Sequence, residues 1–197
     1  MNLKTGLLSL VGVFFLASCG CNNNSKKTEV NEADFDNATK DAESKHGCYK
    51  KVTSDVHIKV VSEEGTKEEN KPVQLDFKSW ETPESVKFPV YEETVKTGDA
   101  FFDGMIVPLF GAIGDIYGMK ISIKEYKEVL TGIKYFKNPY TISIDNATMK
   151  GVIDFDDHYI ISNYDILVVG DEANAEVTYH YTGKIHGENF ITPSSQN

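Results

Sequence analysis

Residues 159–185 read YIISNYDILVVGDEANAEVTYHYTGKI, and this stretch decides the fold. Apolar and polar residues alternate over 159–169 and again over 175–185, which is the period of a half-buried β-strand. The segment Gly170–Glu172 between them has the composition of a turn. The stretch therefore predicts two antiparallel strands joined by a short connection.

The same alternation recurs along most of the chain. Pro89 lies inside one alternating segment, and its missing N–H indicates an edge strand or a bulge there. Residues 63–71, EEGTKEENK, are charged and polar throughout and are expected to form a loop. In all, about seven to nine short strands predict a mainly β protein, built as an antiparallel barrel or sandwich. The further predicted strands are 52–61, 73–77, 86–90, 141–144 and 149–155.

One segment has helical spacing instead. Asp99 can cap a helix, Gly111 ends the apolar run, and Pro108 should keep the helix short or kinked. We interpret it as a short apolar helix that plugs the core rather than as a membrane insert, since it is too short to span a bilayer. Residues 119–133 fit either a strand through Ile123 or a helix, and the strand is favoured there. The apolar residues at helical spacing are Phe101, Phe102, Met105, Ile106, Leu109 and Phe110.

The first residues have the layout of an export signal. Lys4 precedes the uncharged run 5–18, which is rich in leucine, valine and phenylalanine. The run ends in Leu16-Ala17-Ser18-Cys19, which resembles the lipobox of bacterial lipoproteins. That resemblance implies a signal peptide over 1–18 and lipidation of the Cys19 sulfur, including palmitate. An ordinary secretory signal that happens to end at a cysteine is the alternative.

The anchor and the composition together predict how the chain is organised. Residues 19–47 are polar and are expected to form a disordered tether that holds the domain roughly 30 Å from the membrane. We expect the β domain over 48–190 and a flexible tail over 191–197. Cys21 and Cys48 could form a disulfide, stay free, or pair with another molecule. The predicted location is the cell envelope, on the outer membrane or on a periplasmic or cell-surface face.

Charge and motifs exclude several functions. The net charge is −10 and every basic residue is a lysine, which argues against a nucleic-acid partner. The chain has no G-x-S-x-G, P-loop or zinc-type spacing, and His180 and His186 lack a third ligand. We therefore predict a protein that is not an enzyme and has neither a metal nor a cofactor. Paired carboxylates distant in sequence are the one catalytic arrangement that the sequence leaves open.

The middle of the chain carries a series of short motifs that lead from a strand to a short helix and then to a strand–turn–strand. They are VKFPV at 86–90, Thr97-Gly98, FDGMI at 102–106, LFG at 109–111 and TISIDNATMKGVIDF at 141–155. In this order they resemble the YceI-like family of polyisoprenoid-binding, lipocalin-like proteins.

This resemblance implies a barrel whose apolar cavity holds an isoprenoid or another long amphiphile. The same side chains could instead fill a solid core, in which case the protein would be an envelope lipoprotein that binds another protein. Both functions stay open from the sequence. The candidate ligand-binding residues are Phe88, Phe102, Ile106, Phe110, Ile142, Ile144 and Val152.

Overall fold

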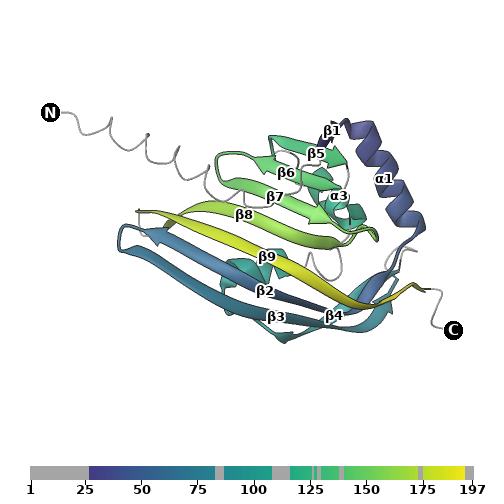
Figure 1. Ribbon diagram of the computed structural model, residues 1–197, viewed down its shortest axis with the longest axis horizontal. Coiled ribbons are helices and arrows are strands. Elements are labelled where there is room, and N and C mark those ends of the chain that lie inside the picture. Colours follow the sequence, from purple (N-terminus) through teal and green to yellow (C-terminus); the bar gives the residue numbers. More distant parts are fainter. Residues whose placement is uncertain are drawn as a thin grey trace.

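The computed structural model describes residues 27–82, 87–107, 116–125, 127, 130–137, 140–172 and 175–193. These residues form one antiparallel sheet and three helical segments (Figure 1). The strands are β1 (Thr28–Val30), β2 (Cys48–Ser62), β3 (Gly65–Glu81), β4 (Phe88–Val95), β5 (Ile133–Lys137), β6 (Thr141–Asp145), β7 (Met149–Phe155), β8 (Ile161–Glu172) and β9 (Ala175–Ile191). The helices are α1 (Glu32–Ser44), the π-helical turn η3 (Phe102–Ile106) and α3 (Ile116–Glu125).

The sheet is open. Its nine strands lie in the order β1-β5-β6-β7-β8-β9-β2-β3-β4, so β1 and β4 are the two edges. Within the described residues these edges do not pair with each other, and the strands form one sheet rather than two. The prediction of a mainly β antiparallel protein is confirmed, whereas the closed barrel and the sandwich are wrong. Closure depends on whether the edge strands meet, and strand periodicity does not report on that.

One face of the sheet is buried, and we name it the inner face. Along β2, Val52, Val56 and Ile58 are buried while the residues between them are half-buried or exposed, apart from Ser54 on the inner face. Helices η3 and α3 lie on one side of the sheet (Figure 1). Their residues Phe102 and Ile116 are fully buried in the same core as the strand residues. The opposite side is the outer face.

The predicted helix begins where the sequence places it, whereas the strand favoured after it is wrong. Asp99 accepts a hydrogen bond from the N–H of Phe102 at 2.7 Å, as expected of a cap at the start of η3. Phe110 and Gly111 lie outside the described residues. The strand favoured through Ile123 is wrong, because residues 116–125 form α3. No helix in the described part of the chain has the length and apolarity needed to cross a membrane.

The bounds of two predicted irregular segments are wrong. Residues 65–71, which were expected to belong to a charged loop, are the first part of β3 and pair with β2. The expected flexible tail begins one residue too early, since β9 reaches Ile191, and residues 194–197 lie outside the described residues. Pro89 lies in β4, an edge strand as expected.

The disordered tether is the largest correction. Of residues 19–47, residues 28–30 form β1 and residues 32–44 form α1. Asn31 caps α1 through a reciprocal pair of bonds with Asp34. Phe35 is buried and stacks on Tyr135 of β5, with the ring centroids 4.2 Å apart. Phe35, Ala38 and Ala42, which are buried on one face of α1, therefore hold the helix on the domain.

A hydrogen bond links α1 to the connection between β7 and β8. The hydroxyl of Tyr159 donates to Asp41 of α1, and Lys45 forms an ion pair with the same carboxylate at 2.6 Å. Burial and the bond to Asp41 raise the pKa of Tyr159 to about 12. This contact holds α1 against the end of the sheet.

Replacing Tyr159 with Phe should therefore have an effect that depends on pH. An unfolded tyrosine has a pKa of about 10, so the neutral phenol stabilises the fold below about pH 10. This contribution is lost as the pH rises from about 10 to about 12. Urea unfolding of both proteins should show a difference in unfolding free energy that shrinks over that interval. A difference that stays constant across it would contradict the raised pKa.

Candidate functional site

The inner face carries an apolar row that runs across four strands. Met149 of β7 lies opposite Val168, Val168 opposite Tyr179, and Tyr179 opposite Val60 of β2. All four side chains are only half-buried. With neighbouring strands about 4.8 Å apart, the row is about 14 Å long. It is an apolar strip at the margin of the core.

The next row towards the centre of the sheet is different. Ile166, Tyr181 and Ile58 lie opposite one another there and are 3%, 0% and 4% exposed. The interior is therefore filled with side chains in this row, and accessible apolar surface begins only at the Val168–Tyr179 row. The strip marks the boundary between the packed core and the open end of the sheet.

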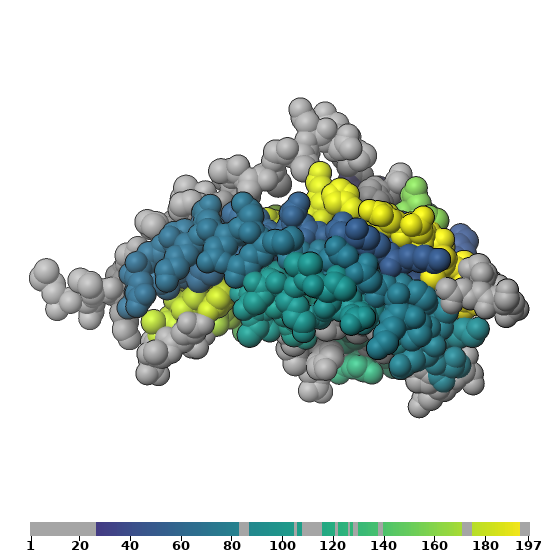
Figure 2. Space-filling view, turned by 90° about the horizontal axis from the view of Figure 1, so that it is seen from below, coloured from purple at the N-terminus to yellow at the C-terminus, as the bar shows by residue number. Residues whose placement is uncertain are grey.

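A pocket adjoins this strip at the tips of two hairpins. Figure 2 shows the tip of the β2–β3 hairpin beside that of the β8–β9 hairpin, beyond the segment that holds β4 and η3. The pocket has a volume of about 330 Å³, within the range of small-molecule sites. Its lining residues are Val60, Ser62, Glu63, Glu64, Gly65, Lys67, Ala175 and Val177.

The rim of the pocket is charged, whereas its base is apolar. Val177 is 4% exposed and Val60 belongs to the apolar strip, so the pocket and the strip are continuous. Lys67 lies directly opposite Val60 and ends the row with an ammonium group. Glu63 and Glu64 add carboxylates of the opposite sign. The combination suits a molecule with an apolar body and a polar or zwitterionic head.

A stack of aromatic rings connects the strip with the helical segment. The ring of Tyr179 lies parallel to that of Tyr181, at 6.3 Å between centroids. Tyr181 stacks in turn on Phe101, at 5.5 Å, and contacts Phe102. A molecule bound against Tyr179 would therefore lie two rings away from the start of η3.

The hydroxyl of Tyr181 is held by the cap of η3. It donates to Asp99 at 3.2 Å, and burial together with this carboxylate raises the pKa of Tyr181. Asp103 accepts from the hydroxyl of Thr97 at 2.7 Å and from the N–H of Gly98 at 2.8 Å. The Asp103 bonds fix the preceding loop to η3, and the Tyr181–Asp99 bond connects that loop to β9.

The structure brings together only some of the residues predicted to bind a ligand. Phe102, Ile106, Ile142 and Ile144 lie in the buried core, and none of them lines the pocket. Phe88 is on the edge strand β4, where its ring contacts His46. Val152 follows the outward register of β7, opposite Asp165, and Phe110 lies outside the described residues.

The strip itself was missed from the sequence. Its signal was available, because alternation places Val168 on the same face as Ile166, and Tyr179 on the same face as Tyr181. What the alternation does not show is that the strands continue past the helices that cover the inner face. The resemblance to the YceI-like family implied a barrel with an apolar cavity, so the predicted binding residues lie in the middle of the sheet and not at its end.

The described polar groups form ion pairs rather than a metal centre. His180 contacts Asp165 at 2.7 Å, and His57 contacts Glu68 at 3.5 Å, both on the outer face. His186 has the same strand parity as His180 and lies opposite Thr53. Within the described residues no group of three histidine, cysteine or carboxylate side chains could hold a metal ion.

Comparison of the chain with protein-family models and with curated proteins finds no match. The resemblance to the YceI-like family therefore stays a prediction. The fold and site together define a mainly β protein whose open antiparallel sheet has helices on its inner face and an apolar strip at one end.

Asp99 provides a test of the cap beneath the strip. Replacing Asp99 with Ala removes the acceptor for Phe102 and Tyr181 and should lower the unfolding free energy by about 1–2 kcal/mol. Asp99→Asn keeps a side-chain oxygen and should cost clearly less. Urea unfolding of the two variants measures the difference, and equal losses would show that the capping bond does not stabilise η3.

Proposed function

We propose that this protein is a lipid-anchored protein of the cell envelope that binds a hydrophobic amphiphile on the inner face of its sheet. The observation that carries the proposal is the half-buried strip Met149–Val168–Tyr179–Val60, which leads into a pocket with a charged rim. An exposed apolar surface bordered by polar groups is typical of a binding site. The proposed ligand keeps the class expected from the sequence, an isoprenoid or similar long molecule.

The strip and the pocket bind different parts of the ligand. The apolar tail lies along the strip, where the ring of Tyr179 supplies the largest contact. The polar head lies at the hairpin tips, near Lys67, Glu63 and Glu64. Binding removes the rest of the strip from water. Because each side chain is already half-buried, each contributes less than the about 1.5–3 kcal/mol of complete burial.

A charge placed in the strip should weaken binding. Val168→Asp puts a carboxylate against the tail and should weaken binding of the fluorescent probe N-phenyl-1-naphthylamine by about tenfold or more. Val169→Asp is the matched control, because the neighbouring residue has the opposite strand parity and follows the outward register. Organic extraction of the wild-type protein and mass spectrometry should also return a co-purified lipid.

The site proposal fails under two results. One is a protein that is reproducibly empty on extraction and does not bind the probe. The other is equal probe affinity of the Val168→Asp and Val169→Asp proteins, which would locate binding elsewhere.

The anchor has its own test. We infer that the Cys19 sulfur carries the acyl chains, since Leu16-Ala17-Ser18-Cys19 matches the lipobox pattern. Several chains on one cysteine hold a protein in a membrane far more firmly than one. Radiolabelled palmitate should mark the protein in its native host, and Cys19→Ser should move it to the soluble fraction. Firm membrane association of the Cys19→Ser protein would contradict the anchor.

Protein binding is the second candidate function. The observation that favours it is the filled interior, in which Phe102, Phe155 and Tyr181 have no exposed surface. In this case the protein would act through an exposed surface and would need no ligand. Empty protein on extraction, together with one protein captured in stoichiometric amount by affinity purification, would favour this role over the first.

A further inference from the structure

The chain between the proposed anchor and the folded domain is short. Lys27 already contacts the sheet, and only eight peptide steps separate it from Cys19. A fully extended chain spans at most about 3.3–3.6 Å per residue, so Lys27 lies within about 28 Å of the anchored sulfur. The contour of the 29-residue tether expected from the sequence would allow more than three times this reach. The domain is thus held close to the membrane.

The point where this short segment meets the domain is defined by contacts. The ammonium of Lys27 forms an ion pair with Asp154 of β7 at 3.0 Å. Asp156 follows two residues later, about 7 Å further along the chain. Its carboxylate accepts a hydrogen bond from the hydroxyl of Tyr49 at 2.7 Å. The segment from the anchor therefore reaches the domain beside Tyr49.

Tyr49 belongs to a group of aromatic residues at this end of the sheet, which we name the aromatic end. Its ring contacts Phe190 and His158, with centroids 5.5 and 6.0 Å away. The hydroxyl of Tyr91 donates to the carbonyl oxygen of Tyr49 and so connects a second group. That second group holds Phe77, Trp80, Phe88 and His46, whose rings are in mutual contact.

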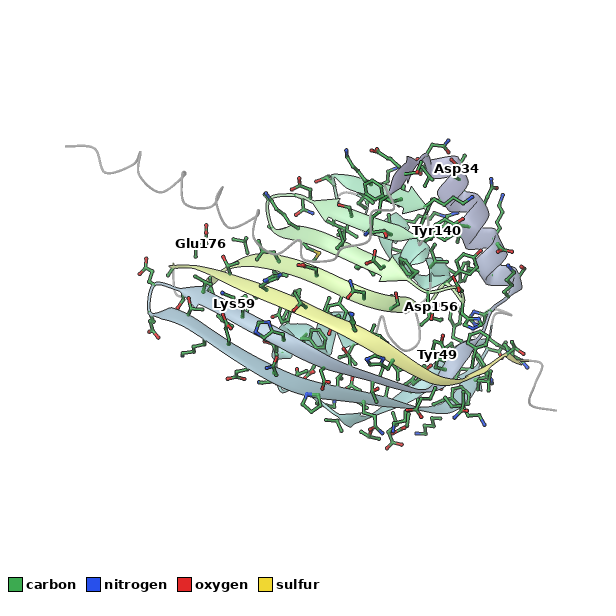
Figure 3. The ribbon with its side chains drawn as sticks, viewed as in Figure 1. Asp34, Tyr49, Lys59, Tyr140, Asp156 and Glu176 are labelled. Carbon is green, nitrogen blue, oxygen red and sulfur yellow. The ribbon has the colours of Figure 1, made fainter. Side chains whose placement is uncertain are left out.

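The aromatic end is partly accessible and lies opposite the pocket. Trp80, Phe88 and Phe190 are half-buried rather than enclosed in the core. Figure 3 shows Tyr49 and Asp156 near α1, whereas Lys59 and Glu176 are at the other end of the long strands. Tryptophan and tyrosine are enriched in the headgroup layer of a bilayer. Because the indole N–H of Trp80 is buried, the accessible part of its ring is apolar.

Charge at the aromatic end neither favours nor opposes an anionic membrane. Among the described residues within two positions of these rings, exposed lysines and exposed acidic residues are equal in number. They are Lys45, Lys50, Lys78 and Lys87 against Glu81, Glu92, Asp157 and Glu188. Attraction between lysines and anionic lipid is therefore offset locally, and the rings are left as the main contact with lipid.

We propose that the aromatic end docks on the headgroup layer of the membrane that holds the anchor, so that the pocket at the hairpin tips points away from that membrane. This orientation rests on the proposed acylation of Cys19. It makes the inner-face strip accessible from the aqueous side, where it can receive an amphiphile from a carrier or from an opposing membrane.

Trp80 allows a direct test, since it is the single tryptophan of the chain. The full-length acylated protein is reconstituted into phosphatidylcholine vesicles whose acyl chains are brominated close to the headgroup. Trp80 emission should be lower in these vesicles than in unbrominated ones, and the loss should persist in high salt. The matched control is Trp80→Phe combined with Glu176→Trp, which moves the indole to the hairpin tips and should show no loss.

The outcomes separate docking from anchoring. Protein that floats with the vesicles but has equal Trp80 emission in both lipids overturns the docking while the anchor stands. Protein that does not float overturns the acylation of Cys19 and the docking together, and leaves ligand binding by the strip to its own test. A glycine–serine insertion after Asn24 lengthens the segment. Quenching that survives the insertion supports docking by the rings, and quenching that disappears shows that they do not bind lipid.

Discussion

The pairing of β2 with β9 is the constraint on which the rest of the structure depends. It joins β2-β3-β4 to the strands from β5 to β8, and it runs without a register shift from Cys48↔Ile191 to Val61↔Thr178. Because the side-chain period of a strand is two residues, this register places Val56, Ile58 and Tyr181 on the same face. That face packs against η3 and α3, so the core, the strip and the pocket all follow from one ladder.

The length of these two strands also creates the candidate site. The ladder continues beyond the last core row, where the inner-face side chains of β2 and β9 are half-buried apart from the buried Val177. Where the core ends, Ile58 and Tyr181 give way to Val60 and Tyr179, and the row ends at Lys67. A closed barrel would bury its ligand in the centre, whereas this open sheet presents an apolar surface at one end.

The alternation of apolar and polar residues was sufficient to predict the strands that have one buried and one solvated face. It failed for 65–71, because the tip of the β2–β3 hairpin extends past the core, and both of its faces carry exposed residues. It also failed for Ile121 and Ile123, where a short run fits two periods and α3 is the outcome. Helix α1 was missed because its buried stripe contains little more than Phe35, Ala38 and Ala42. A barrel differs from an open sheet in whether its edge strands pair with each other. The sequence of a single strand does not show this.

The position of β9 has a consequence for how the chain is made. The last strand occupies an interior place in the sheet, between β8 and β2, so neither half can join the other before residue 191 has been synthesised. Contacts this distant in sequence form slowly, because the entropy of closing a long loop is lost first. The complete sheet therefore forms only at the end of elongation, and until then a nascent chain exposes the unpaired edges of β8 and β2.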